Sequence, residues 1–294
     1  MSDLSTYLSE QRRWIDYELD RHMPAETDRP TLLHQAMRYA VFSGGKRLRP
    51  ILCIAAATGL KADRAQALLP AIAIEVLHTY TLVHDDLPAM DDDALRRGQP
   101  TTHIRFGEGQ AILVGDALLT LAFEWLAACV APPPFAPGQL IVELAEASGS
   151  RGIIGGQSED LTAVDQPGHE VDLDYIHLHK TATLFRAALR MGGIVAAANA
   201  EELDALSTYG CNLGLAFQIT DDLLDETGTT EIIGKPAGSD RRNEKVTYIT
   251  RHGFDAARRR AAQLIDEAVL ALNTLRGDTT PLTDIARAML NRTS

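Results

Sequence analysis

Apolar residues recur at steps of three and four along most of the chain, in segments rich in Ala and Leu. This spacing lines one face of an α-helix, and runs of alternating β-branched residues, which would indicate strands, are nearly absent. The pattern predicts helices from Thr31 to the glycine pair at 44–45, over 64–87, 109–130, 138–149 and 172–198, from Asn199 to about Asp225, and over 254–274 and 281–291. We therefore expect residues 1–294 to form a single all-α domain, a bundle of about ten helices.

Local signals set several of the expected helix ends. Thr31 follows a proline and can cap the first of these helices, and Pro88 ends another. Asn199 and Glu202 have the spacing of a variant capping box. The proline-rich segment at 132–138 is too short to link two domains, so we expect a surface loop there.

Composition and charge exclude several classes of protein. The 294 residues are 45% hydrophobic and 23% charged, which supports a packed core and is unlike a disordered chain. A net charge of −12 argues against nucleic acid or an anionic membrane surface as the main partner. The longest apolar runs, such as 51–57, are far shorter than the roughly 18 residues of a membrane helix, and the first residues lack a signal-peptide pattern. Three widely separated cysteines, Cys53, Cys129 and Cys211, indicate reduced thiols, so we expect a cytoplasmic protein with no membrane span.

Two clusters of aspartates follow apolar segments. One is Asp85-Asp-Leu-Pro-Ala-Met-Asp91, continued by Asp92 and Asp93, and the other is Asp221-Asp-Leu-Leu-Asp225. The C-terminal end of a helix carries partial negative charge, so carboxylates are unfavourable there. Asp221 and Asp225 also share one helical face, which costs stability unless a cation lies between them. One such cluster is most simply a solvated surface, but two with apolar flanks favour sites for a hard divalent cation such as Mg²⁺.

Basic residues are grouped in the same parts of the sequence. They occur in the turn Gly44-Gly-Lys-Arg-Leu-Arg-Pro50, at Arg96 and Arg97 after the first aspartate cluster, at Lys180, and at Lys235 and Lys245 after the second cluster. In a chain of net charge −12 these groups are not a general basic coat, and Arg and Lys side chains suit the oxygens of phosphate groups. Scattered cations, such as those at 258–260, more simply pair with surface carboxylates.

Taken together, these motifs resemble those of the trans-isoprenyl diphosphate synthases, and most closely the bacterial-type farnesyl diphosphate synthases. The resemblance runs from about residue 30 to 250 and rests on the turn at 44–50, His84 to Asp93 with Leu95 to Gly98, Gly155-Gly-Gln157 with Asp160-Leu161, His179-Lys-Thr181, Phe217 to Asp225, and Gly234-Lys235. Four residues separate Asp86 from Asp91, the spacing of bacterial-type and plant-type members. The resemblance implies an isoprenoid synthase domain in which the helices surround a central cavity.

The resemblance also implies roles for individual residues. Mg²⁺, with three ions in each active site, would be bound by Asp85, Asp86, Asp91, Asp221, Asp222 and Asp225. The allylic diphosphate would contact Arg96, Lys180 and Lys235, with Lys245 nearby. The diphosphate of isopentenyl diphosphate would be held without metal by Lys46, Arg49, His78 and Arg97. Thr181 and Gln218 would direct oxygens toward the developing allylic cation, and the catalytic set comprises these two residues with Asp85, Asp86, Asp91, Asp221, Arg96 and Lys180.

The implied activity is that of a prenyltransferase. Isopentenyl diphosphate would condense head to tail with dimethylallyl diphosphate and then with geranyl diphosphate, through metal-assisted ionisation, condensation and loss of a proton. Tyr80 and Thr81 lie five and four residues before Asp85, roughly 7.5 and 6 Å along a helix. Tyr80 would form a floor below the growing chain, and in the family an aromatic residue here accompanies a fifteen-carbon product, farnesyl diphosphate. The resemblance also implies a homodimer, with the apolar helix at 109–130 as the candidate interface.

Three other activities remain as alternatives. A geranylgeranyl diphosphate synthase would share these motifs and differ in product length. A class I terpene cyclase shares the fold and the first aspartate motif, but normally carries an Asn/Ser/Glu arrangement in place of the cluster at 221–225. A non-catalytic subunit of a partner synthase would be expected to lack an aspartate motif or the basic residues, and here all are present. His84 is left out of the site because it lies about 100° around the helix from Asp85.

Overall fold

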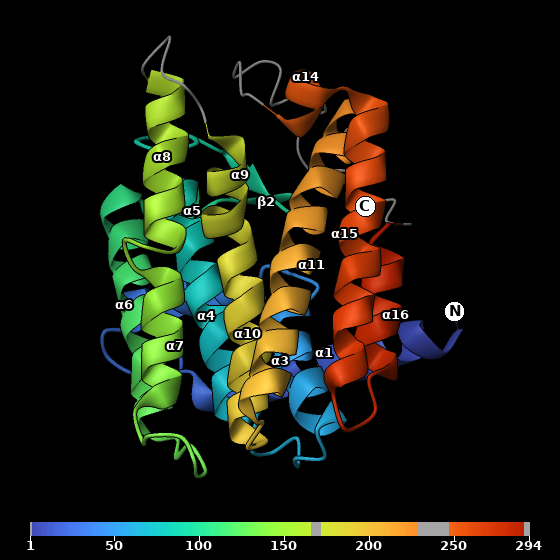
Figure 1. Cartoon of the computed structure of the whole chain (residues 1–294). Helices are drawn as coiled ribbons and strands as arrows, with labels where there is room; N and C mark the ends of the chain where they lie inside the picture. The colour runs from blue at the N-terminus through green and yellow to red at the C-terminus, as the bar shows by residue number, and fades with distance from the viewer. Residues whose placement is uncertain (1, 166–171, 228–246, 291–294) are drawn as a thin grey trace. The chain divides into compact units, whose positions relative to one another are not determined.

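The computed structural model describes residues 2–165, 172–227 and 247–290 (Figure 1). Within these ranges eleven helices have ten or more residues, and the only strands are two of two residues each. The all-α fold expected from the sequence is confirmed. The chain divides into two compact units, one of residues 1–51 and 68–130 and one of residues 52–67 and 131–294, and the expectation of a single domain stays a prediction.

The first unit is built around one buried helix, α4 (Leu68–Asp85). Twelve of its eighteen residues are buried, because the segment carries apolar side chains on almost every face. It packs most extensively against α6 (Glu108–Ala127), and also against α1 (Ser2–His22) and α2 (Thr31–Phe42). The remaining elements are the start of α3 (Leu48–Gly59), β1 (Leu95–Arg96), β2 (Gln99–Pro100) and α5 (Thr102–Phe106).

A glycine permits the close approach of α4 and α6. A Cβ atom at Gly115 would overlap the imidazole ring of His84. Nε2 of that ring is 3.1 Å from the carbonyl oxygen of Ile112, one turn earlier on α6. The last turn of α4, which ends at Asp85, is therefore fixed against α6.

By length and composition α6 could also cross a membrane, with a mean hydropathy of 1.4 over an 18-residue window. It is the single such helix in the part of the chain that the structure describes, and the expectation of no membrane span, based on shorter apolar runs, did not anticipate it. A core helix meets the same criterion, and eight residues of α6 are buried in the first unit. Ile112 and Leu113 are instead 47% and 51% exposed.

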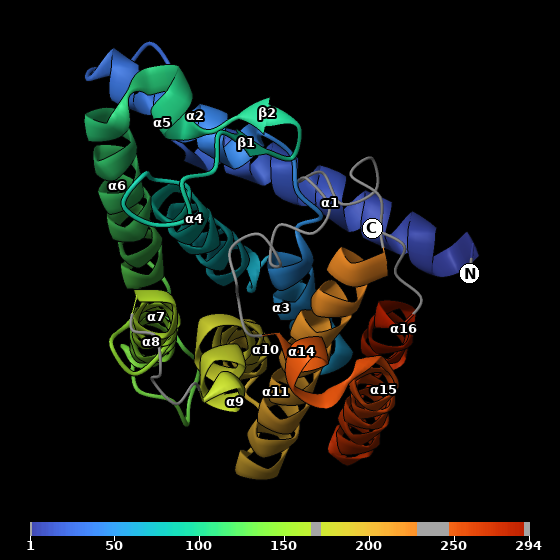
Figure 2. The same ribbon diagram turned by 90° about the horizontal axis from the view of Figure 1, so that it is seen from above.

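The second unit is organised along α11 (Ala200–Thr227), the longest helix among the described residues. α10 (Thr183–Val195) and α15 (Phe254–Ala271) pack on either side of it, as Figure 2 shows. The unit also contains the rest of α3, α7 (Gln139–Ser148), α8 (Ile153–Asp165), α9 (Leu173–Ile176), the π-helical turn η1 (His177–Ala182), α14 (Tyr248–His252), the 3₁₀ turn η2 (Leu272–Thr274) and α16 (Thr280–Met289).

The expected start of α2 at Thr31 is confirmed, but its expected cap is wrong. Pro30, and not Thr31, occupies the N-cap, and no side chain caps the helix there. The helix expected from residue 64 begins only at Leu68. The preceding residues form two tight turns, in which the backbone N–H of Gln66 donates to the carbonyl of Asp63 and that of Ala67 to the carbonyl of Arg64.

The capping box at Asn199 is confirmed. Its backbone N–H donates to Oε2 of Glu202 at 2.9 Å, and the backbone N–H of Glu202 donates to Oδ1 of Asn199 at 2.9 Å. The segment 172–198, expected as one helix, is instead α9, η1 and α10 in succession. The structure also contains α1, α3, α5, α8 and α14, which the apolar pattern did not predict.

The buried His177 in η1 makes the stability of the protein sensitive to acid. Burial lowers its pKa from 6.5 to about 4, against the opposite effect of Asp174 and Asp160. The unfolded chain therefore binds a proton more readily, and the free energy of unfolding falls by about 3 kcal/mol as the pH decreases from 6.5 to 4. We expect His177→Gln to remove this part of the loss, as measured by urea unfolding at pH 7 and 4.5. His179→Gln, a neighbouring half-buried control, should lose stability as the wild type does, and the same loss in His177→Gln would contradict the assignment.

Candidate active site

The first aspartate motif lies at the end of α4 and in the loop after it. The helix ends at Asp85, and the loop folds back so that the backbone N–H of Asp91 donates to the carbonyl oxygen of Asp85 at 2.9 Å. Asp92 has a left-handed φ of +52°, which aspartate tolerates better than most residues. The loop therefore brings Asp85 and Asp91 next to each other, and both are half-buried.

Asp86 is buried and bonded to Arg96. Nε of Arg96 is 2.7 Å from Oδ1 of Asp86, and Nη2 is 2.6 Å from the same oxygen. Burial disfavours the charged guanidinium, but the hydrogen bond and the charge of Asp86, followed by the charges of Asp93 and Asp85, outweigh this and raise the pKa of Arg96. Asp86 thus anchors the antiparallel pair of β1 and β2, with Arg96 on β1 and Arg97 in the turn between the strands.

The basic loop, residues 44–47 between α2 and α3, contacts Arg97. The guanidinium of Arg97 donates a hydrogen bond to the carbonyl oxygen of Gly44. Gly44 and Gly45 have φ values of +98° and +136°, and a Cβ atom at Gly45 would lie 2.7 Å from Nη1 of Arg97. The left-handed backbone conformation therefore favours glycine at both positions.

Four arginines lie close enough to His78 on α4 to affect its ionisation. Burial lowers the pKa of His78 well below 6.5, and the charges of Arg49, Arg97, Arg96 and Arg47 lower it further. The imidazole is therefore neutral near pH 7 and has one ring N–H to donate. The structure thus brings together three of the residues predicted to hold isopentenyl diphosphate, His78, Arg49 and Arg97. The fourth, Lys46, is exposed on the basic loop.

A cavity of about 590 Å³ opens beside Arg97 in the first unit. Arg38, Arg105, Tyr39, Phe42 and Phe106 also line it. The guanidinium carbon of Arg105 is 4.2 Å from the centre of the Tyr39 ring, a cation–π contact. Sequence reasoning missed this cavity, because its lining comes from α2, α5 and the hairpin, which no single motif connects.

In the second motif, Asp222 is buried and accepts two hydrogen bonds. Nε2 of Gln218, one turn earlier on α11, is 3.2 Å from its Oδ1, and the backbone N–H of Tyr248 donates to its Oδ2 at 2.9 Å. The hydroxyl of Thr181 donates to Oε1 of Gln218 at 3.0 Å. A continuous hydrogen-bonded chain therefore joins Thr181, Gln218 and Asp222, three of the predicted site residues.

Lys180 and Thr181 lie in the π-helical turn η1. Nζ of Lys180 forms an ion pair with Oδ2 of Asp160 on α8 at 2.7 Å. A Cβ atom at Gly156 of α8 would overlap the backbone of Lys180, so glycine lets the two elements meet. Turns of this kind are frequent at functional sites, and here the turn presents adjacent residues to α8 and to α11.

The two aspartate motifs share one arrangement. The second aspartate of each, Asp86 or Asp222, is buried and bonded to other groups of the protein, whereas the first, Asp85 or Asp221, is half-buried. Buried carboxylates need such partners to stay ionised. One aspartate in each motif therefore has a structural task in addition to its predicted part in metal binding.

The donor type in these motifs fits magnesium, since carboxylate oxygens are the ligands that Mg²⁺ prefers. Among the described residues, no three His, Cys, Asp or Glu side chains already come together as a metal site. Asp225 lies on α11, but its side chain is outside the described residues, as are Lys235 and Lys245. The metal ligands therefore stay a prediction.

Tyr80 and Thr81 lie on α4, little more than one turn before Asp85, and both are buried. The ring of Tyr80 meets that of His84 edge to face, with centroids 5.5 Å apart. The hydroxyl of Thr81 donates to the carbonyl oxygen of His78 at 2.8 Å. Burial, with a smaller effect of the Asp85 charge, raises the pKa of Tyr80. Tyr80 is thus a fixed, neutral ring near the first motif.

The all-α fold described above is shared by solved structures of isoprenyl diphosphate synthases. A family model described as polyprenyl synthetase matches residues 30–278. The chain belongs to this family and is a prenyltransferase.

Individual relatives carry more than one name. The chain is 41% identical over 272 residues to the farnesyl diphosphate synthase of Geobacillus stearothermophilus, covering 91% of each chain. It is 39% identical over 295 residues to the geranylgeranyl diphosphate synthase of Cyanophora paradoxa, covering 99% of this chain and 97% of that one. A solved structure of a geranyltransferase from Helicobacter pylori, complexed with magnesium and isoprenyl diphosphate, superposes with a TM-score of 0.82 at 34% identity. It covers 99% of this chain and 97% of that one.

Proposed function

We propose that this prenyltransferase makes farnesyl diphosphate, by adding isopentenyl diphosphate first to dimethylallyl diphosphate and then to geranyl diphosphate. The observation that carries the proposal is the buried ring of Tyr80, five residues before Asp85 on α4. At 1.5 Å per residue the ring lies roughly 7.5 Å along the helix from the aspartate. A chain anchored by its diphosphate at Asp85 and growing along α4 would meet this ring and stop.

Geranylgeranyl diphosphate is the second candidate product. The relative from Cyanophora paradoxa carries that name, whereas the relative from Geobacillus stearothermophilus is named for the farnesyl product. The two identities are nearly equal, so the names support both products equally. The size of residue 80 is the physical difference on which our proposal rests.

The aspartates would hold Mg²⁺. Asp85, Asp91 and Asp221 present carboxylates at half-buried positions, and the internal bonds of Asp86 and Asp222 keep the backbone around them in place. When bound, Mg²⁺ would neutralise the allylic diphosphate and, as a Lewis acid, promote its departure. The magnesium in the Helicobacter pylori structure supports this choice of ion. The number of three ions rests on the sequence resemblance.

Two cations would bind the allylic diphosphate. Arg96 uses Nε and Nη2 for Asp86, which leaves Nη1 for a phosphate oxygen. Lys180 pairs with Asp160 at 2.7 Å and would share its remaining N–H donors with the diphosphate. Both side chains are held by carboxylates before the substrate arrives, so little of their freedom is left to lose on binding.

Thr181 and Gln218 would face the allylic cation. The hydroxyl of Thr181 donates a hydrogen bond to Oε1 of Gln218, and Nε2 of Gln218 donates one to Oδ1 of Asp222. Each oxygen therefore keeps lone pairs that favour a developing positive charge. Asp222 at the end of this chain fixes the orientation of the Gln218 amide.

The diphosphate of isopentenyl diphosphate would bind to Lys46, Arg49, Arg97 and the neutral His78. Guanidinium groups form strong, directional hydrogen bonds to phosphate oxygens without a metal. A neutral imidazole adds a hydrogen-bond donor without raising the positive charge of a region that already holds several arginines.

We further propose a homodimer formed through α6, because Ile112 and Leu113 on that helix are about half exposed.

Loss of either aspartate motif should abolish most turnover. We expect Asp85→Ala and Asp221→Ala to lower kcat by roughly a hundredfold or more, because each removes a metal ligand and neither removes core packing. Product formation at saturating Mg²⁺ and the melting temperature measure the two effects. Asp92→Asn, an exposed neighbour of the first motif, is the control and should stay active, because asparagine also tolerates the left-handed backbone. Near wild-type turnover of Asp85→Ala or Asp221→Ala would show the ligand assignment to be wrong.

Removal of His78 or Arg97 should affect one substrate only. A charge-assisted hydrogen bond contributes about 1.5–3 kcal/mol, so we expect Arg97→Ala to raise KM for isopentenyl diphosphate roughly 10- to 100-fold. His78→Ala should do so to a smaller extent, and KM for the allylic substrate should change little in both. Arg105→Ala removes another arginine from the cavity beside Arg97 and should change neither KM. Equal effects on both substrates would argue against separate diphosphate sites.

The side chain at position 80 should control product length. Tyr80→Ala removes the buried ring, so we expect products of twenty carbons or more, with the first condensation largely retained. Tyr80→Phe keeps the ring without the hydroxyl and should still make farnesyl diphosphate. The chain length of the products is measured by mass spectrometry. The proposal is wrong if the wild-type enzyme makes mainly geranylgeranyl diphosphate. It is also wrong if Tyr80→Ala leaves the product unchanged.

A further inference from the structure

Arg47 is the buried member of the basic loop. Lys46 before it is exposed and Arg49 after it is half-buried, whereas Arg47 is 4% exposed. Its φ of +54° lies in the left-handed region, which is uncommon for residues other than glycine. Such a conformation persists only where surrounding contacts hold it.

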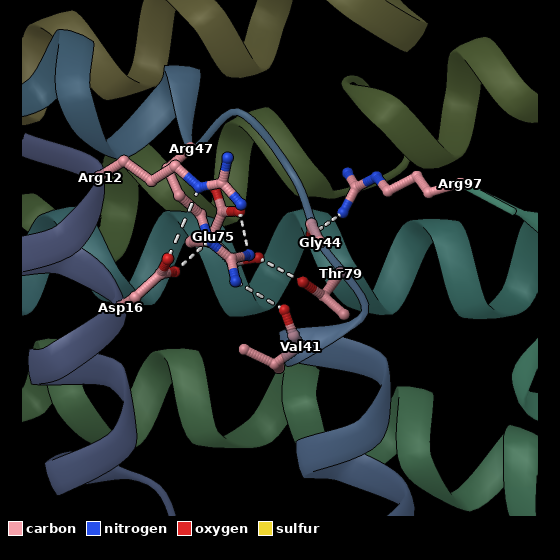
Figure 3. A network of polar contacts seen from close by, with 8 residues as sticks. All are labelled: Arg12, Asp16, Val41, Gly44, Arg47, Glu75, Thr79 and Arg97. Atoms are coloured by element: carbon pink, nitrogen blue, oxygen red, sulfur yellow. Dashed lines mark hydrogen bonds and ion pairs between the residues drawn. The ribbon is translucent and has the colours of Figure 1, made fainter. Parts of the chain in front are cut away.

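The guanidinium of Arg47 binds three helices of the first unit (Figure 3). Nε is 2.8 Å from Oδ1 of Asp16 on α1, and Nη1 is 2.8 Å from Oε1 of Glu75 on α4. Nη2 is 2.7 Å from the carbonyl oxygen of Val41, near the end of α2. Each of the three nitrogens therefore has an acceptor, and each acceptor lies on a different helix. Glu75 is the one acidic residue among the buried residues of α4.

The guanidinium of Arg47 forms ion pairs inside the protein, whereas the charge of Arg97 is acted on by Glu75 only from a distance. Two carboxylates, from Asp16 and Glu75, surround the guanidinium of Arg47. Arg97 forms no ion pair with the described residues, and bonds instead to the carbonyl of Gly44 in the same loop. One arginine thus holds the loop from inside, and the other keeps its charge for a ligand.

From this geometry we infer that Arg47 is a positioning residue for the diphosphate of isopentenyl diphosphate, with Asp16 and Glu75 as its necessary partners. The inference rests on the function proposed above. Arg47 does not touch the substrate, and acts by fixing the backbone from which Lys46 and Arg49 project.

A consequence is that α1 supports the diphosphate site. Asp16 lies before residue 30, where the match to the polyprenyl synthetase family begins. Through Arg47 the helix α1 holds the basic loop, and a change at Asp16 should therefore reach the site.

The test uses Asp16→Asn and Arg47→Lys in the full-length protein. Asparagine keeps the size of Asp16 without its charge, and lysine keeps the charge of Arg47 but lacks the planar fork that reaches three acceptors. We expect each variant to raise KM for isopentenyl diphosphate about tenfold and to leave KM for dimethylallyl diphosphate unchanged. Asp16 is only half-buried, so Asp16→Asn provides the test even where Arg47→Lys fails to fold.

Arg190→Lys is the matched control. Nε and Nη2 of Arg190 bind the Glu143 carboxylate at 2.7 and 2.6 Å in the second unit, so the variant breaks a comparable pair away from the basic loop. It should lower the melting temperature and change neither KM. A purely structural role of Arg47 predicts the same behaviour for Asp16→Asn and Arg47→Lys.

Calorimetric titration with inorganic pyrophosphate in the absence of metal separates this inference from the proposed function. We expect the wild type and Arg190→Lys to bind equally and Asp16→Asn to bind about tenfold more weakly, whether or not the wild type condenses isopentenyl diphosphate. If the wild type shows no condensation of isopentenyl diphosphate but binds pyrophosphate, the proposed function is wrong and the inference about Arg47 still stands. Unchanged pyrophosphate affinity in Asp16→Asn, an equal rise of both KM values, or no pyrophosphate binding by the wild type would overturn the inference.

Discussion

The site depends on carboxylates that stay charged where the backbone opposes them. Both aspartate motifs stand at or near the C-terminal ends of helices, whose partial charge is negative. Internal donors stabilise the buried carboxylates: Arg96 pairs with Asp86, and the backbone N–H of Tyr248 donates a hydrogen bond to Asp222. These bonds hold more than the two aspartates, because the first fixes the β1–β2 hairpin and the second fixes the start of α14.

The buried arginines likewise keep their charge only where partners offset the cost of burial. Arg47 has two carboxylate partners and Arg96 has one close partner, so burial does not cost them their charge. Burial lowers the pKa of Arg97 against the opposite effect of Glu75, and the neighbouring Arg47 and Arg96 lower it further. An oxyanion placed there would relieve the repulsion among these groups, which is a reason for such a cluster to bind diphosphate without a metal.

Features encoded by nearby residues could be predicted from the sequence, and those encoded by distant residues could not. The capping box of Asn199 and Glu202 needs only its spacing and is confirmed. The helix α8 was not predicted because Gly155 and Gly156 weaken the helical signal, yet Gly156 is needed where the backbone of Lys180 approaches. The start of α4 was placed too early because apolar spacing continues through residues that form tight turns.

In the candidate site, too, features encoded by nearby residues were predicted and contacts between distant residues were not. The two aspartate motifs and the basic loop were recognised because each is contiguous in sequence. The internal partners were not: Arg96 was expected to meet only a substrate, but it already binds Asp86. Glu75 did leave a signal, as a lone carboxylate in an apolar helix, and that signal pointed to a buried cation without saying which one.

The π-helical turn at His177–Ala182 also shows how the chain length can vary inside a packed helix. A π turn holds one residue more than an α turn, so deletion of one residue would let α9 and α10 join as a regular α-helix. Because the π turn takes up its extra residue within one turn, the side chains of α9 and α10 keep the faces that they would have in a helix one residue shorter. Insertions and deletions are usually tolerated in loops and excluded from packed helices by stability. Here a packed helix contains one surplus residue, because the π turn accommodates it locally and leaves the direction of the side chains on either side unchanged.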